Sequence, residues 1–299
     1  MNSILTRQEK ILKAVAHIIL GLFSVLAVIP FWLLIASSFS ESDYALKEGY
    51  RFLPRELSLS AYQYILREAD QIGHAYIITI LVTVLGTSAG IIITSTLAYG
   101  LAQKKVPGAG VITALILFTL LFSGGIVPQY MIYNNILHFK NTLLGLIVPN
   151  LLTNGFSVFL VRNYIRFSIP GELSEAMDID GAGPLKIYRM LILPLSTPIL
   201  ATIGVMGAVT YWNDWKNGLY YITDAKLYSV QHLLSEMNNN IMFLANNASD
   251  PLIEINVYDL PTTTMRMAIA VVGILPILIA YPFFQKYFAK GITVGAVKG

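Results

Sequence analysis

The sequence predicts an all-α membrane protein with six transmembrane helices and a short helical segment at the membrane surface between the fourth and fifth. Its 299 residues are 55% hydrophobic, and their mean hydropathy is +0.63. Only 12% of them are charged, whereas soluble domains carry about 25%. Apolar segments recur along the chain, each close to the ~20 residues that a helix needs to cross a bilayer. The chain has no cysteine, which excludes a disulfide framework and cysteine metal sites.

The six spans are predicted from apolar runs that end at charged or turn-forming residues, within a single domain over 1–299. The first is longer than the ~7–15 apolar residues of a signal peptide, so we expect an uncleaved helix. The second ends before Lys104-Lys105, the third is broken at Ser123-Gly124-Gly125, and the fourth contains Pro149. The predicted spans are 14–38, 76–102, 109–133, 141–163, 195–215 and 265–286, with outer loops over 41–75 and 217–263.

The segment 170–194 is a polar, mixed-charge block between two apolar segments. Pro170 suits the start of a helix, because its missing N–H would have no partner there. Glu175 lies near that start, where a carboxylate complements the helix dipole. Gly181 can adopt the left-handed conformation that ends a helix, and Pro184 can begin another. The pattern therefore predicts a helix, a tight turn and a second helix at the membrane surface.

The distribution of charge predicts the topology through the positive-inside rule. With the N-terminus in the cytoplasm, the inner segments hold twelve of the twenty basic residues and five carboxylates. The outer segments hold the other eight basic residues and twelve carboxylates. Both termini and the 170–194 segment are therefore predicted to be cytoplasmic, in a multi-pass protein of the cell membrane. The inner basic residues are Arg7, Lys10, Lys13, Lys104, Lys105, Arg162, Arg166, Lys186, Arg189, Lys286, Lys290 and Lys298.

The chain carries no pattern that indicates catalysis. No P-loop motif occurs, so the chain does not bind ATP by that route. Its four histidines are scattered without metal-ligand spacing, and no nucleophile elbow or metalloprotease motif appears. No carboxylate lies between Asp70 and Glu172, which argues against a proton relay within the membrane but not against a sodium site built from backbone carbonyls. The energy for any transport is therefore expected from a partner.

The stretch EAMDIDGAGPLKIYRMLILP, from Glu175 to Pro194, resembles the EAA loop of ABC importer permeases. The family pattern is E-A-A, three residues, G, nine residues, I, one residue and L-P. Its glycine matches Gly181, and Asp180-Gly181-Ala182 matches the D-G-A core of sugar-type permeases. Met177 and Leu191 replace an alanine and the isoleucine of the pattern, and both replacements are apolar. The alternative from the residues alone is an ordinary amphipathic hairpin between two membrane helices.

The resemblance implies that 170–194, named here the coupling loop, forms a cytoplasmic coupling helix that docks in a groove of an ATPase subunit. The chain itself would then have no catalytic residue and no cofactor, because ATP and Mg²⁺ are bound by the partner ATPase. The implied partners are a second permease subunit, an ATPase dimer, an extracytoplasmic binding protein, a carbohydrate and the lipid bilayer, with no nucleic acid. The implied docking residues are Glu175, Ala176, Met177, Asp180, Gly181 and Ala182.

The C-terminal stretch 285–299 is similar to the ending of maltose-type sugar permeases, with Lys290-Gly291 and Gly295-Ala296-Val297-Lys298-Gly299 at matching places. This similarity favours a carbohydrate, most of all an oligosaccharide, as the solute. In that family the loop that corresponds to 217–263 touches the binding protein. An ABC importer for a non-sugar solute and an ion-coupled secondary carrier are the alternatives.

Two polar and aromatic stretches are candidates for the solute path. Tyr211, Trp212, Asn213 and Trp215 end the fifth predicted span, where sugar-type permeases commonly carry a W-N pair. Aromatic faces can pack on sugar rings, and amides can bond hydroxyl groups. An interfacial aromatic belt is an equally good reading of the rings. Asn150 and Asn154 form the second candidate set, for which helix–helix contact is the alternative.

Overall fold

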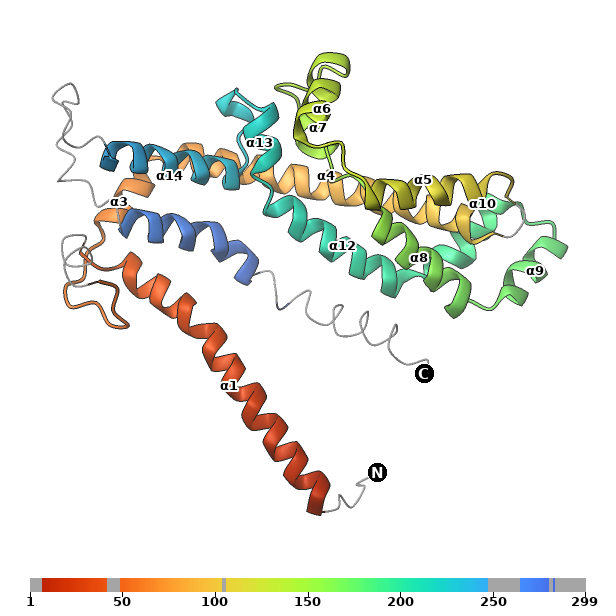
Figure 1. Cartoon of the computed structure of the whole chain (residues 1–299), viewed down its shortest axis with the longest axis horizontal. Helices are drawn as coiled ribbons and strands as arrows, with labels where there is room; N and C mark the ends of the chain where they lie inside the picture. The colour runs from red at the N-terminus through yellow and green to blue at the C-terminus, as the bar shows by residue number, and fades with distance from the viewer. Residues whose placement is uncertain (1–6, 42–48, 104–105, 247–263, 280–281, 283–299) are drawn as a thin grey trace. The chain divides into compact units, whose positions relative to one another are not determined.

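The computed structural model describes residues 7–41, 49–103, 106–246, 264–279 and 282, which form helices joined by turns and one isolated β-bridge (Figure 1). The predicted similarity at 285–299 lies outside the described residues. The chain divides into two compact units, one of residues 1–69 and 236–276, the other of residues 70–235 and 277–299. We describe each unit by itself.

The first unit contains the longest exposed apolar helix, α1 (Arg7–Ser38), and the short helix α3 (Ser60–Arg67). A β-bridge joins Ser40, which follows α1, to Leu57, which precedes α3. Most of the large hydrophobic side chains of α1 are exposed, as expected for a helix that faces lipid or another subunit. An apolar helix over Thr264–Ile279 belongs to this unit as far as Pro276.

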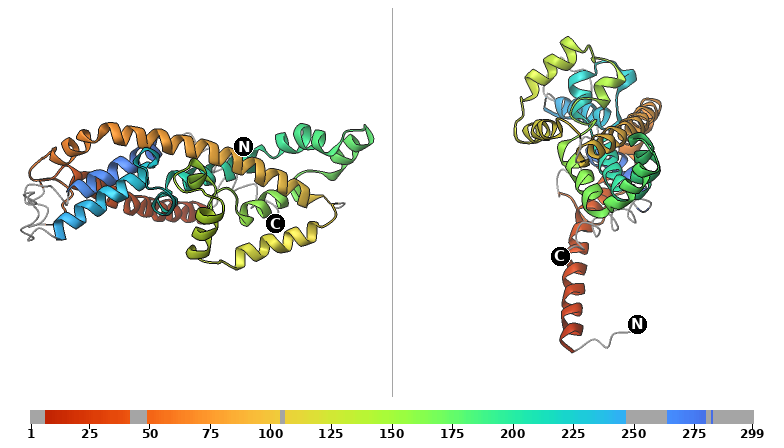
Figure 2. Two further views of the ribbon diagram at one scale, coloured as in Figure 1. Left: turned by 90° about the horizontal axis from the view of Figure 1, so that it is seen from above. Right: turned by 90° about the vertical axis from the view of Figure 1, so that its right-hand side faces the viewer.

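The second unit is organised around α4 (Ala69–Ala102), which has 34 residues and is therefore about 51 Å long. Helix α12 (Thr197–Trp212) runs antiparallel alongside it (Figures 1 and 2). Gly204 of α12 faces Ile91 of α4, whereas Gly207, later in α12, faces Thr87, earlier in α4. Glycines let the two helix backbones approach closely, as is common between membrane helices.

The third predicted span is broken where its sequence predicts a break. Helix α5 (Ala109–Leu121) and the continuous pair α6 (Ile126–Tyr130) and η1 (Met131–Ile136) meet at an angle of 120°. Gly125 stands at the bend with a φ of 82°, a conformation that suits glycine. The η1 segment is a π-helix.

The fourth predicted span, 141–163, is two helices instead of one. Helix α7 (Leu143–Ile147) and helix α8 (Gly155–Ser168) are separated by turns over 148–154. Asn150 adopts a φ of 61°, which an α-helix does not allow. The side chain of Asn154 then accepts a bond from Ser157 N–H at 2.8 Å and begins α8 as its N-cap.

The coupling loop forms four short helices, α9 (Gly171–Ile179), α10 (Pro184–Ile187), η2 (Tyr188–Ile192) and α11 (Leu193–Leu195). The start of a helix at Pro184 confirms the prediction. Figure 1 shows α9 at the end of the second unit at which α4 ends. The helical run from α10 to α11 meets α12 at an angle of 78°.

The predicted loop 217–263 contains helices α13 (Lys216–Tyr221), η3 (Ala225–Leu227) and α14 (Val230–Asn246) in its described part. By length and composition, two described helices could cross a membrane, Lys10–Ser38 and Ala69–Ala102, and four could if each bent pair is one span. The count of six remains a prediction.

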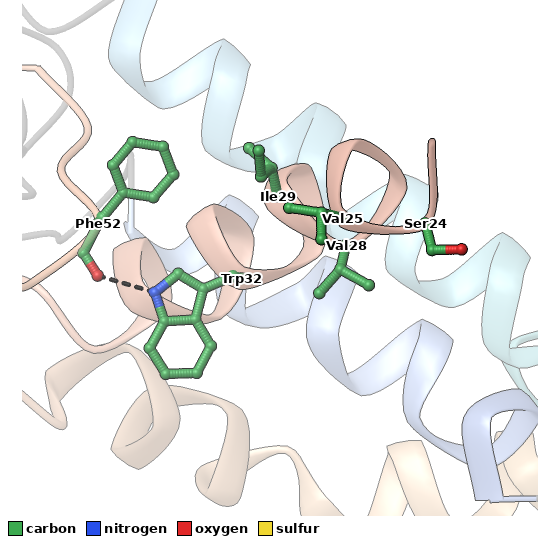
Figure 3. Close-up of a pocket in the computed structure, with 6 residues that line it drawn as sticks. All are labelled: Ser24, Val25, Val28, Ile29, Trp32 and Phe52. Atoms are coloured by element: carbon green, nitrogen blue, oxygen red, sulfur yellow. Dashed lines mark hydrogen bonds between the residues drawn. The ribbon is translucent and has the colours of Figure 1, made fainter. Parts of the chain in front are cut away.

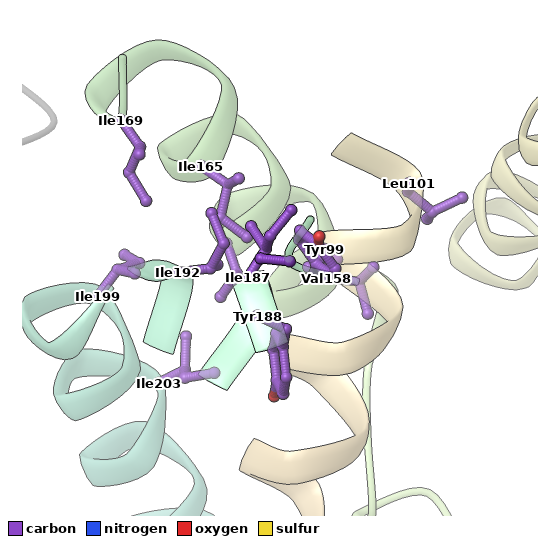
Figure 4. Close-up of a cluster of buried hydrophobic side chains, with 13 residues drawn as sticks. Tyr99, Leu101, Val158, Ile165, Ile169, Ile187, Tyr188, Ile192, Ile199 and Ile203 are labelled. Atoms are coloured by element: carbon purple, nitrogen blue, oxygen red, sulfur yellow. The ribbon is translucent and has the colours of Figure 1, made fainter. Parts of the chain in front are cut away.

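The core of the second unit joins the coupling loop to the long helices (Figure 4). Buried residues from α4, α8, α10, η2 and α12 pack together there. A second cluster joins α4, α7 and α12 around Tyr211 and Ile147.

Candidate functional site

The turn in the coupling loop has the geometry of a Schellman motif. The N–H of Gly181 donates to the carbonyl of Asp178 at 3.0 Å, and the N–H of Ala182 donates to that of Met177 at 2.9 Å. This pair of bonds requires a left-handed residue at the first position after the C-cap of the helix, and Gly181 supplies it with a φ of 76°. The predicted helix-ending glycine is therefore confirmed.

This turn directs two of the predicted docking side chains into the protein. Ala182 is 4% exposed, and Met177 packs against the same buried cluster. A contact between these two positions commonly accompanies the Schellman motif. Both belong to the predicted docking residues, and in the structure both pack against the core. Their side chains therefore join the C-terminal end of α9 to the core.

The opposite face of α9 is exposed. Glu175, Ala176 and Ile179 are exposed, and residues four apart lie on the same side of a helix. Ile179 is 86% exposed, more than any other large hydrophobic residue that the structure describes. Asp180 continues this surface toward the turn. Sequence reasoning missed Ile179, although an isoleucine four residues after Glu175 in a polar stretch was the available signal.

Tyr211, the first predicted path residue, is packed inside the second unit. It is 4% exposed, and its hydroxyl donates to the carbonyl of Ile147 at 2.9 Å. A side chain at Gly86 of α4 would overlap the Tyr211 ring. Tyr211 therefore ties α12 to α4 and α7.

The other residues of this stretch are more accessible. Trp215 is 42% exposed and precedes α13. Asn213 is exposed, and its amide donates to the carbonyl of Val209 at 2.9 Å. Trp212 is half-buried, with its ring 6.3 Å from that of Tyr76. Trp215 and Asn213 thus present polar and aromatic groups at the surface of this unit.

Asn150 and Asn154 are exposed residues of the break between α7 and α8. The amide of Asn150 donates to the side-chain carbonyl of Gln129 at 2.9 Å, which ties the break to α6. Asn154 caps α8. Each amide therefore has a partner within the chain and shapes the broken backbone.

The two predicted path stretches meet through a residue that sequence reasoning missed. Asn217 is 6% exposed, and its amide donates to the carbonyl of Pro149 at 2.9 Å. It therefore ties α13, which follows Trp215, to the break that contains Asn150. The pair Asn217-Gly218 reads as an ordinary turn, so the sequence held no signal for this role.

An aromatic cluster also joins η1 to α13. The Tyr221 ring lies 5.9 Å from that of Tyr130 and 6.0 Å from that of Tyr133, and Tyr133 stacks on Phe139. Burial raises the pKa of Tyr221, and the neighbouring phenols, first Tyr133, raise it further. The ring contacts of the cluster therefore pack α6 and η1 against α13.

Two further features of the described residues involve none of the predicted site residues. A pocket of about 410 Å³ lies on α1 and is lined by apolar side chains and Ser24 (Figure 3). At its edge, Trp32 Nε1 donates to the backbone carbonyl of Phe52 at 3.0 Å. Among the residues that the structure describes, no three His, Asp or Glu side chains gather so that they could hold a metal ion.

The chain is similar over nearly its whole length to curated permease proteins. It is 34% identical over 279 residues to the polygalacturonan/rhamnogalacturonan transport system permease protein YtcP of Bacillus subtilis (strain 168), covering 93% of this chain and 95% of that protein. It is 28% identical to the melibiose/raffinose/stachyose import permease protein MelC of the same strain, over 100% of both. No family model matches the chain.

A solved structure shares the fold. A chain in the crystal structure of a bacterial ABC transporter involved in the import of the acidic polysaccharide alginate matches with a TM-score of 0.76 and 27% identity. The match covers 96% of this chain and 100% of that one. The fold and the similarity together define a membrane-embedded transport subunit.

The chain belongs to the family of permease proteins of sugar ABC transporters. It is the permease subunit of an ABC importer and carries no catalytic activity, because a separate ATPase subunit hydrolyses ATP. It is a membrane protein whose importer also includes an ATPase and a binding protein.

Proposed function

We propose that the protein moves a carbohydrate, in particular an oligosaccharide, across the cell membrane by ATP-driven alternating access. The observation that carries this proposal is the similarity over nearly the whole chain to permeases named for carbohydrate transport. Exposed Trp215 and Asn213 offer the ring face and the amide that carbohydrate recognition uses, so they are the better candidates for contact with the solute. Tyr211, Trp212, Asn150 and Asn154 would shape the path around them.

The importer would contain this chain, a second related permease, an ATPase dimer that binds ATP and Mg²⁺, and an extracytoplasmic binding protein. The exposed apolar surface of α1 would face the lipid or the second permease. The described part of 217–263 would meet the binding protein. The chain would cross the membrane six times, with both termini and the coupling loop in the cytoplasm, as the excess of basic residues in those segments indicates.

The coupling loop would dock in a groove of the ATPase through the exposed face of α9. Ile179 is the large apolar side chain on that face, and fully desolvated apolar anchors dominate the binding energy of many interfaces. Glu175 would pair with a basic residue at the rim, and Ala176 would allow close contact. Met177, Gly181 and Ala182 would contribute by fixing the shape of the loop, and Asp180 by extending its exposed edge.

Transport in liposomes tests the proposed function. The permease pair, the ATPase and the binding protein would be reconstituted, and ATP hydrolysis and uptake measured with trigalacturonate, raffinose and an arabino-oligosaccharide. We expect one class of sugar to stimulate hydrolysis and to accumulate only with ATP. Uptake that followed an ion gradient without ATP would contradict the proposal.

A further inference from the structure

Two tyrosines cross between the coupling loop and the C-terminal end of α4. Tyr188, the first residue of η2, places its hydroxyl 2.7 Å from the Ser95 hydroxyl of α4. In the reverse direction, Tyr99 of α4 donates to the carbonyl of Pro184 at 3.2 Å. The two rings lie 5.4 Å apart, and Figure 4 shows them side by side. We name these reciprocal contacts of Ser95, Tyr99, Pro184 and Tyr188 the tyrosine clasp.

The clasp is buried and fixes one register. Tyr188 is 8% exposed and Ser95 is 2% exposed. Ser95 and Tyr99 are four residues apart on α4, and Pro184 and Tyr188 are four apart in the coupling loop, so each pair lies on one face of its helix. Sliding of the loop along α4 would separate the Tyr188 hydroxyl from its partners Ser95 and Thr96, and a buried hydroxyl without a partner is costly in a low-dielectric interior. The loop is therefore held to α4 at one position.

The covalent connection from the coupling loop to α12 is not a continuous, straight α-helix. It passes through η2, a π-helical segment, and then through the 78° bend before Thr197. Irregular helical turns of this kind are frequent at functional sites. A displacement of α9 therefore has two routes into the second unit, a bent covalent route to α12 and the tyrosine clasp to α4.

We propose that the Ser95–Tyr188 hydroxyl pair makes the coupling loop and α4 move as one body, so that α4 follows the ATPase together with α12. The inference rests on the proposed docking of the coupling loop. Tyr188 is then a positioning residue, because it acts on the solute path through α4 and touches neither ATP nor the solute. Without the hydroxyl pair, ATP hydrolysis continues while less solute moves for each ATP.

The first test compares uptake with hydrolysis in liposomes that contain the complete importer, with raffinose and trigalacturonate as probes. Tyr188→Phe removes one hydroxyl and keeps the ring, Ser95→Ala removes the other, and a third variant carries both changes. We expect Tyr188→Phe to lower the sugar moved per ATP about fivefold, the factor that the loss of one buried hydrogen bond corresponds to. Ser95→Ala should lower it less, because the Thr96 hydroxyl also donates to the Tyr188 hydroxyl, at 3.3 Å. The double variant should lose no more than Tyr188→Phe alone, because that change already removes the bond to Ser95.

Tyr62→Phe is the matched control. Its hydroxyl forms an equivalent pair with Ser38 at 2.8 Å within the first unit, so its removal should leave the ratio of uptake to hydrolysis unchanged. An unchanged ratio in Tyr188→Phe and Ser95→Ala would overturn the proposal. A fall in uptake and hydrolysis in proportion to the amount of assembled complex would also overturn it, because the pair would then be structural alone.

A second test does not depend on the sugar. Since the chain has no cysteine, spin labels can be placed at Ile93→Cys on α4 and Lys186→Cys in the coupling loop of the complex with its ATPase. We expect the same distance between the labels with and without ATP, and a distance that changes with ATP in Tyr188→Phe. A distance that already changes in the parent would overturn the clasp. Lack of ATP-dependent uptake alone would contradict only the proposed transport of these sugars.

Discussion

At the scale of single residues, exposure separates the side chains proposed to dock from those that pack against the core within the coupling loop. Met177 and Ile179 are two residues apart, yet Met177 packs against the core while Ile179 is 86% exposed. If α9 docks through this face, Ile179 is the large apolar side chain that the partner would bury. The surface of α9 therefore predicts which substitution should weaken the complex.

Ile179→Asp should release the ATPase without unfolding the permease. The side chain has almost no contacts to lose within the chain, whereas the loss of an interface anchor costs 2 kcal/mol or more, about thirtyfold in affinity. Recovery of the ATPase with the purified permease would measure the effect. Leu53→Asp is the control, because Leu53 is 75% exposed in a segment predicted on the other side of the membrane. Equal recovery from both variants would contradict docking through Ile179.

At the scale of elements, the turn that ends α9 depends on one glycine and tolerates change at another. Gly181 has a φ of 76°, and an alanine there would be strained by roughly 1 kcal/mol. Gly183 has a φ of −67° and a ψ of 163°, and a Cβ added there would meet nothing within 4 Å. Gly181→Ala should therefore lower the thermal stability of the assembled complex and the recovery of ATPase, whereas Gly183→Ala should change neither. The same loss from both variants would contradict the turn geometry.

Local signals explain which elements could be predicted. Glycine and proline restrict the backbone by themselves, so the break at Gly125, the turn at Gly181 and the helix start at Pro184 could be read from the sequence. Pro149 was a signal for the break after α7, but the positive φ of Asn150 could not be read, because asparagine adopts it only where its surroundings favour it. Helix α14 was missed for a related reason. Its run of three asparagines has a low helix propensity, which tertiary packing overrides.

The inward or outward orientation of a side chain was the least predictable part of the candidate site. The family-like register identified the coupling loop, but the turn hydrogen bonds decide that Ala182 faces the core. Asn217 is similar, since its bond to the carbonyl of Pro149 joins residues that are far apart in the sequence. Such contacts depend on how distant segments fold together, and the residues near each partner in the sequence do not indicate this.

At the scale of the whole molecule, the unequal distribution of charge predicts which side of the membrane each segment occupies. Basic residues concentrate in the termini and the inner segments, while most carboxylates lie in the loops between, and this bias sets the orientation of membrane proteins. The absence of cysteine allows a direct test with single introduced cysteines at exposed positions. Lys10, Glu175 and Lys226 are exposed in the structure, the first two in segments predicted inside and the third in a segment predicted outside.

A membrane-impermeant maleimide should therefore label Lys226→Cys in right-side-out membrane vesicles, and Lys10→Cys and Glu175→Cys only in inside-out vesicles. Detergent-solubilised protein, in which all three cysteines should react, is the control for intrinsic reactivity. Labelling of Glu175→Cys from the outside would place the coupling loop away from ATP and contradict the docking of an ATPase there. Labelling of Lys226→Cys from the inside would instead remove the segment from α13 to α14 as a contact for the binding protein. The two results are linked, because the bent helix pair from α10 to α12 is the element predicted to carry the chain across the membrane between these positions.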